Sequence, residues 1–152
     1  MNKVLYIILI SLLSFTVIFC AKKDESTDAT TTTSSGLYVA VGYTGTILTS
    51  TDATTWTSRT SGTSNYLAGV TYGNSTFVTV GESGIILTSS DGISWDNRTY
   101  NTSNGLYHVT HANNTFVTVG EAGTILTSSD GITWTARTSG TSNTLSKITY
   151  KE

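Results

Sequence analysis

The sequence predicts an all-β fold, a segment of a β-propeller made of three four-stranded antiparallel repeats. The first observation is composition: of 152 residues, 38% are hydrophobic and 12% charged, with 14 glycines and no proline. Threonine and tyrosine favour pleated strands, and glycine supplies turns. The second observation is internal repetition: residues 37–152 repeat every 39 positions without a gap, as Gly42, Gly81 and Gly120 show.

The middle repeat shows how each unit divides into strands. Four short β-rich runs, at 67–72, 77–80, 85–88 and 94–99, are separated by turn residues such as "GNST", "GESG" and "SSDG". Short turns join antiparallel neighbours, so the four runs predict a meander. The second and third runs are apolar on both faces, which is typical of strands in a sheet covered on both sides. Four-stranded units with a period of about 40 residues are propeller blades.

A recurring motif, G-x-x-G-x-I-L-T-S-x-D-G-x-[ST]-W, carries a resemblance to known proteins. It resembles the Asp-box (BNR-type) repeat of sialidase-like propellers, and more closely the repeat of photosystem II assembly/stability factor-like propellers found in bacterial exported proteins. The resemblance covers residues 37–152. In this chain the motif is one residue shorter between aspartate and tryptophan than the usual Asp-box. The resemblance implies a propeller fold and a chaperone or scaffold role.

The first 36 residues differ in kind from the rest. Residues 1–20 contain Lys3, then an apolar run that ends at Cys20, the only cysteine. A run of this length suits a signal peptide. Cys20 resembles the lipid-attachment residue of a bacterial lipoprotein; the alternative is an uncleaved signal anchor. Residues 21–36 are rich in threonine and serine and predict a disordered tether. We therefore expect an exported protein of the bacterial cell envelope, lipid-anchored at the outer membrane or cell surface.

The ends of the repeat region are complementary pieces of one blade. "LYVAVG", from residue 37, matches a second strand, and "LSKITYKE", from residue 145, matches a first strand. Propellers typically have four to eight blades, so three blades predict an incomplete ring unless the chain oligomerises. A homodimer of six blades would pair the two ends and remove exposed sheet edges. The alternative is a non-functional fragment of a larger propeller protein.

Two sets of repeated residues predict structural roles. An aspartate in a turn between strands can accept backbone N–H bonds and hold the turn. A tryptophan that recurs once per blade is expected to pack between blades. The turn set is Asp52, Asp91 and Asp130, and the packing set is Trp56, Trp95 and Trp134.

Alternating strand direction places the turns between second and third strands at the same end as the loops between blades. That end collects acidic, aromatic and basic residues, which form the candidate binding face: Tyr43, Glu82, Glu121, Arg59, Arg98 and Arg137. Arginines with a tyrosine and glutamates resemble a sialidase site, and paired carboxylates can perform glycosidic acid–base chemistry. However, the arginines are strictly periodic, and no unique acid stands out from the repeat.

The sequence accordingly predicts no enzyme activity. We expect a non-catalytic binding or scaffold module for an unknown protein or glycan ligand; the alternative is a sialidase-like glycosidase assembled across an oligomer. The net charge of −2 argues against a nucleic-acid partner. His108 and His111 could form part of a metal site, but a solvated or pore-lining pair is favoured because no cysteine or carboxylate completes it. No cofactor and no metal site are predicted.

Overall fold

The computed structural model describes residues 36–98 and 100–152, and residues 35–152 form a compact unit of their own. The predicted signal peptide, Cys20 and all of the predicted tether except Gly36 lie outside the described residues. Within those residues, no helix has the length and apolar character needed to cross a membrane.

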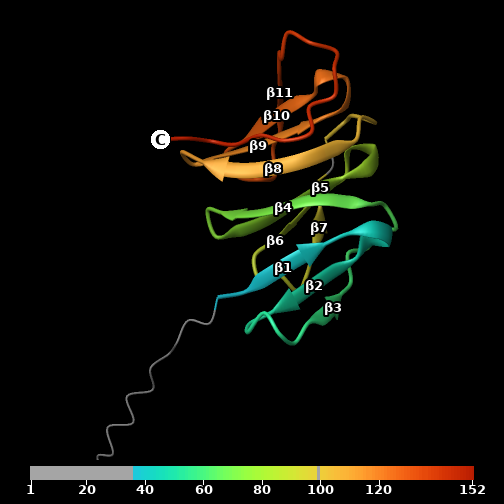
Figure 1. Ribbon diagram of the computed structural model, residues 1–152, viewed down its shortest axis with the longest axis vertical. Coiled ribbons are helices and arrows are strands. Elements are labelled where there is room, and N and C mark those ends of the chain that lie inside the picture. Colours follow the sequence, from blue (N-terminus) through green and yellow to red (C-terminus); the bar gives the residue numbers. More distant parts are fainter. Residues whose placement is uncertain (1–35, 99) are drawn as a thin grey trace, which may run out of the picture. The chain divides into compact units, whose positions relative to one another are not determined.

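The folded unit contains three antiparallel sheets, each a meander in chain order (Figure 1). The first has three strands and the other two have four. The first sheet consists of β1 (Tyr38–Val41), β2 (Ile47–Ser50) and β3 (Thr57–Arg59); the second of β4 (Leu67–Gly73), β5 (Thr76–Gly81), β6 (Ile86–Ser89) and β7 (Asp96–Asn97); the third of β8 (Leu106–Ala112), β9 (Thr115–Gly120), β10 (Ile125–Ser128) and β11 (Thr135–Arg137). The predicted all-β architecture of propeller blades is confirmed.

By repeat position, β1 corresponds to the second strand of a blade and β2 to the third. A short 3-10 turn joins these two strands in every blade: η1 (Tyr43–Gly45), η2 (Glu82–Gly84) and η3 (Glu121–Gly123). In η3, Gly123 has a φ of +69°, a conformation that costs an L-residue energy. A β-carbon at Gly123 would also lie only 1.9 Å from the Thr141 carbonyl oxygen. The turn therefore packs directly against the loop that leads out of the blade.

The strands differ from the predicted ones at two places. The fourth strand of the second blade was predicted over 94–99, but β7 covers only Asp96–Asn97. The segment 145–152 was predicted to be a first strand, and it is not assigned to any sheet of the described residues. The physical reason is that a strand needs a hydrogen-bonding neighbour, and nothing equivalent to β5 lies beside this segment.

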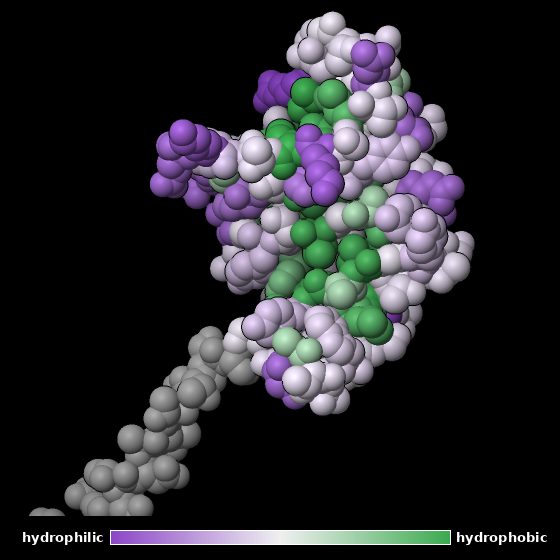
Figure 2. Space-filling model, in the orientation of Figure 1, coloured by the Kyte–Doolittle hydropathy of each residue, from purple (hydrophilic) through white to green (hydrophobic). Residues whose placement is uncertain are grey.

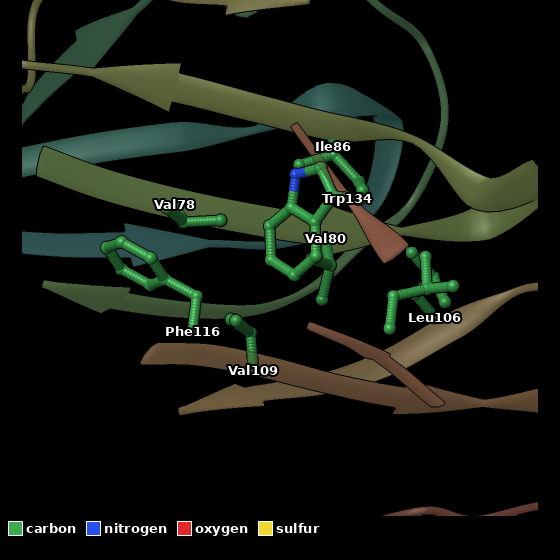
Figure 3. Packing of buried hydrophobic residues seen from close by; sticks show 8 residues of the cluster. Val78, Val80, Ile86, Leu106, Val109, Phe116 and Trp134 are labelled. Carbon is green, nitrogen blue, oxygen red and sulfur yellow. The ribbon is translucent and has the colours of Figure 1, made fainter. Parts of the chain in front are cut away.

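The main core lies between blades, not within one sheet. Val78, Val80 and Ile86 of the second blade are fully buried against the third blade. The third blade contributes Phe116 and Trp134 to the same cluster, and Figure 3 shows the Trp134 ring lying against these aliphatic side chains. Burying an aromatic side chain of this size dominates the local packing energy.

The interface between the first two blades repeats this arrangement. Ile47 of the first blade is buried with Leu87 of the second, and Val39, Val41 and Trp95 pack against them. Viewed from the side of the first strands, apolar side chains gather over β1 and β4, with polar side chains around them (Figure 2). The hydrophobic contacts therefore run along the stack of blades.

The three repeated tryptophans have different surroundings. Trp134 is 6% exposed, Trp95 is half-buried, and Trp56 is 41% exposed. Trp134 and Trp95 each lie against a preceding blade, whereas no blade precedes Trp56 in the described residues. Inter-blade packing, the role predicted for all three, is thus seen for two.

A matched pair of glycine substitutions tests the packing of the turn. Gly123 and Gly140 both have positive φ, but a β-carbon at Gly140 meets no atom within 4 Å. We expect Gly140→Ala to lower the free energy of unfolding by about 1 kcal/mol through backbone strain alone. Gly123→Ala should cost roughly 1–3 kcal/mol more, because its β-carbon overlaps Thr141. Urea unfolding followed by tryptophan fluorescence measures both, and equal losses would contradict the tight turn–loop contact.

Candidate ligand-binding face

The three η turns bring their first residues to one hollow at the loop end of the blades. Tyr43, Glu82 and Glu121 all line this hollow, whose volume is about 470 Å³. The remaining lining residues come from η2, from the loops between blades and from β8, and no lysine or arginine is among them: Ser83, Tyr66, Ser103, Gly105 and Tyr107. The site is therefore acidic and aromatic.

Glu121 is the most firmly held side chain of the hollow. Its Oε1 accepts a hydrogen bond of 2.6 Å from the Tyr107 hydroxyl, and its Oε2 accepts one of 2.9 Å from the Gly105 backbone N–H. These bonds, Tyr107 first, hold the pKa of the Glu121 carboxyl below its ordinary value. The bond to Glu121 in turn raises the pKa of the Tyr107 phenol, which keeps its proton. The pair therefore presents a fixed negative charge.

Glu82 and two tyrosines form the other side of the hollow. The Tyr43 and Tyr66 rings are stacked, with centroids 4.4 Å apart and an interplanar angle of 20°. Glu82 is exposed, and its Oε2 accepts one long bond of 3.4 Å from the Tyr66 backbone N–H. Tyr43 is 75% exposed, so its outer face is open. An exposed carboxylate beside aromatic faces suits a cation, which both groups attract.

The predicted arginines do not join this hollow. They lie at the outer edge of their blades, where each Nε donates to a threonine hydroxyl of the neighbouring strand. The pairs are Arg59 to Thr49 at 2.9 Å, Arg98 to Thr88 at 3.2 Å and Arg137 to Thr127 at 2.8 Å. Arg98 also forms an ion pair of 2.9 Å with Asp96. The arginines thus brace outer strands, and the candidate face separates into an inner acidic part and an outer basic part.

A hollow beside Arg137, of about 500 Å³, is slightly larger than the acidic one. Its counterpart beside Arg59, of about 490 Å³, occurs at the equivalent place in the first blade. A hollow that recurs at equivalent positions follows from the repeat geometry itself. The acidic hollow is different, because Tyr107 occupies a position that is Ala68 in the second blade and Ser146 after the third.

Sequence reasoning missed Tyr66 and Tyr107. The available signal was departure from the repeat: Tyr66 is Gly105 in the next blade, and Tyr107 replaces Ala68. A residue that differs between repeats is not required by the packing that all blades share, so it is a better candidate for function. The prediction instead started from turn and arginine positions that recur in every blade, and Tyr43 was its one member that differs from its counterparts, Glu82 and Glu121.

The three turn aspartates are occupied by their own turns. Asp130 Oδ1 accepts backbone N–H bonds of 2.8 Å from both Ile132 and Thr133, and the Ser128 hydroxyl donates to it at 2.9 Å. Asp52 and Asp91 have the same arrangement. Backbone N–H bonds, from the residue three positions on first, hold the pKa of each carboxyl below its ordinary value.

The two histidines face the packing between first strands. A β-carbon at Gly73 of β4 would overlap the His111 ring, and that ring also lies 4.5 Å from the Phe116 ring. His108 Nδ1 and His111 Nε2 are buried without a hydrogen-bond partner. In the described part of the chain, no group of three or more histidine, cysteine, aspartate or glutamate residues could hold a metal ion.

The sheets and their stacking define the class of this protein as a β-propeller segment. Comparison with solved structures agrees: the chain is similar to the structure described as "YCF48 bound to D1 peptide", with a TM-score of 0.58 and 21% sequence identity. The match covers 67% of this chain and 37% of that one, so the chain spans well under half of its length. No protein-family profile and no curated protein matches the chain. At this identity the likeness shows the fold alone.

The Tyr107–Glu121 bond can be tested by titration. In Tyr107→Phe the phenol hydroxyl is lost, so we expect the pKa of Glu121 to rise towards its ordinary value of 4.5. The Glu121 carboxyl carbon, followed by NMR against pH, reports the shift. Tyr66→Phe is the control, because Tyr66 contacts Glu82 through its backbone only. A Glu121 pKa that is unchanged in Tyr107→Phe would contradict the assignment.

The turn aspartates predict a pH dependence of stability. Their folded pKa values lie below the ordinary value of 3.8, so their stabilisation is present above that value and is lost as the pH falls through the folded pKa. We expect the free energy of unfolding to fall below about pH 4. Replacing all three with asparagine keeps an acceptor oxygen but removes the titration. Urea unfolding across this pH range should then give a flatter profile; an unchanged slope would show that other groups dominate.

Proposed function

We propose that the folded unit is a non-catalytic binding module that holds a basic segment of another protein at the acidic hollow. The observation that carries this proposal is the convergence of two carboxylates and three tyrosines without a lysine or arginine among the lining residues. A lysine or arginine side chain would meet the exposed Glu82 carboxylate and the aromatic faces together.

The fixed charge of Glu121 adds to this preference. Because Tyr107 and Gly105 already hold its carboxylate, a ligand pays little to orient it, and the negative charge persists down to acidic pH. The structure similar to this chain is described as bound to a peptide, which supports a protein segment as the ligand class. A glycan is the alternative ligand that stacked tyrosines would also accept.

We propose that this module acts outside the cell. We propose that residues 1–20 direct export, that Cys20 carries the lipid in the manner of a bacterial lipoprotein, and that residues 21–36 act as the tether. The support is the apolar run ending at the only cysteine of the sequence. We also propose that the chain works as a homodimer.

The glycosidase alternative has less support. A sialidase-like site would need arginines beside the tyrosine and glutamates, yet Arg59, Arg98 and Arg137 are engaged with threonines at the outer strands. Incubation with aryl sialosides and aryl glycosides tests it directly. Turnover that is lost in Glu82→Gln would establish the glycosidase and overturn the binding role.

Binding can be tested with peptides. A library of random peptides, screened on the folded protein, should return sequences centred on lysine or arginine. In the best binders, norleucine or citrulline in place of the basic residue should weaken binding. Glu82→Gln and Glu121→Gln should each weaken it by about 3- to 10-fold, the range expected for a partly exposed charge contact. Fluorescence anisotropy of labelled peptides measures these affinities.

The control is Asp96→Asn, which removes a carboxylate from β7 at the outer edge and should leave binding unchanged. Binders without basic residues, or equal losses in Asp96→Asn and Glu82→Gln, would contradict the proposed site. If the protein instead binds particular glycans on an array and Tyr43→Ala abolishes that binding, the ligand is a carbohydrate and not a protein segment.

A further inference from the structure

We infer that the two outer faces of the blade stack bind each other between two copies of this chain, so that a head-to-tail pair closes a six-blade ring. This rests on the homodimer proposed above and names its surface, its strand register and its key side chain. It does not depend on the ligand.

The interface inside the chain shows what each blade face needs. At the boundary of the second and third blades, an acceptor face of Val78, Val80 and Ile86 is fully buried. The third blade covers it with Phe116, Leu126 and Trp134, a wedge face whose members are at most 6% exposed. At the boundary of the first and second blades, the core cluster contains the equivalent Val39, Val41 and Ile47 on one side and Leu87 and Trp95 on the other. Every internal boundary is thus an acceptor face against a wedge face.

The third blade carries an acceptor face without a wedge. Its members, at the positions equivalent to Val78, Val80 and Ile86, are Val117, Val119 and Ile125. Val117 and Ile125 are only half-buried, whereas their counterparts in the second blade are fully buried. The difference arises because no fourth blade covers them in the described residues.

The first blade carries a wedge face without an acceptor. Its members are Tyr38, Leu48 and Trp56, at the positions of Phe116, Leu126 and Trp134. Tyr38 is 55% exposed and Trp56 is 41% exposed. The two uncovered faces are therefore the two halves of the interface that the chain already builds twice within itself.

The backbone carries the same complementarity. The segment after the third blade is hydrogen-bonded to the end of β9: the Leu145 N–H donates to the Gly120 carbonyl at 2.9 Å, as the Leu67 N–H donates to Gly42 at 3.0 Å. Asn113 Nδ2 also donates to the Tyr150 hydroxyl at 2.8 Å. The segment therefore occupies the place of a first strand but is not paired with a second one.

β1 lacks the other partner: it is a second strand that is not paired with a first one. It is the edge strand of its sheet. An unpaired edge presents N–H and C=O groups that favour pairing with another strand. The β4–β5 register, in which Leu67 faces Gly81 and Val70 faces Thr79, can be carried over by repeat position. It places Leu145 of one copy opposite Gly42 of the other, and Ile148 opposite Ala40.

A turn residue beside the wedge face of the first blade also differs from its counterparts in the later blades. The turn before the tryptophan has Gly92 or Gly131 in the later blades, and Ala53, with a φ of +60°, in the first. A β-carbon at Gly131 would lie 3.1 Å from a Val78 methyl group of the preceding blade. At the contact between copies, the corresponding Val117 would have to yield by a few tenths of an ångström. Val117 is half-buried and can do so.

A second copy is the occupant that fits both faces and both strands at once. The contact is heterologous, since one copy contributes the wedge and the other the acceptor, and such contacts close into rings when the rotation allows. Two copies of three blades give six, which lies within the usual range of propellers. The pair then contains two identical junctions.

The experiment uses residues 21–152, since residues 35–152 form a compact unit of their own and Cys20 is then absent. Sedimentation analysis should show a dimer. Trp56→Ala should weaken dimerisation on the order of 100-fold or more, because each dimer has two such aromatic contacts. Ile132→Ala is the control: Ile132 is similarly exposed, at 52%, but belongs to neither face, and the dimer should persist.

The register is tested by mixing two singly substituted chains. Ala40→Cys and Ile148→Cys should form a disulfide between copies under mild oxidation, because opposite residues of paired strands lie close enough. Ala40→Cys with Thr144→Cys, outside the predicted pairing, should not. A dimer that persists in Trp56→Ala and lacks the disulfide would overturn this surface while leaving the homodimer standing. A monomer at micromolar concentration would overturn both, and neither result bears on peptide binding.

Discussion

The fold depends on one contact, the tryptophan of a blade lying on the valine and isoleucine side chains of the blade before it. A single four-stranded sheet whose central strands are apolar on both faces cannot keep both faces from water. In the middle blade both faces are covered, because a blade is stacked on each side. Trp134 packs at one of these two boundaries and Trp95 at the other. The same rule leaves Trp56 and the face around Val117 uncovered. The constraint that builds the stack is thus also the reason to expect a partner at its ends.

Most residues that keep the repeat serve that stack, whereas the acidic hollow combines the repeated Glu82 and Glu121 with tyrosines that differ between repeats. Turn aspartates accept backbone N–H groups, and arginines brace outer strands through threonines, in all three blades. A side chain that recurs in every blade with the same contacts has a structural role, which those contacts explain. Tyr107 has no such counterpart, and its bond to Glu121 fixes a charge in the hollow. Residues that differ between repeats are therefore better candidates for a specific function than residues of the repeated motif alone.

Much of the fold could be predicted from the sequence, because period, turn residues and apolar runs are local signals that agree with one another. The four-strand meander and the positions of its turns follow from them. What could not be predicted depends on neighbours distant in the chain. The segment after Leu145 has a strand-like sequence but is not assigned to a strand, because no second strand lies beside it. Likewise, the arginines share an end of the blades with Glu82, but only the packed loops show that they lie outside its hollow.

The proposed ring determines how the two binding hollows are presented. β1 runs from Tyr38 to Val41 and leads directly into η1, whose Tyr43 lines the hollow. The chain thus enters the folded unit at the end of β1 opposite to the hollow. In a two-copy ring the two-fold axis lies along the ring axis, so both hollows open on the same side of the ring. Two basic segments of one partner would then bind together, with the gain in affinity that linked sites give.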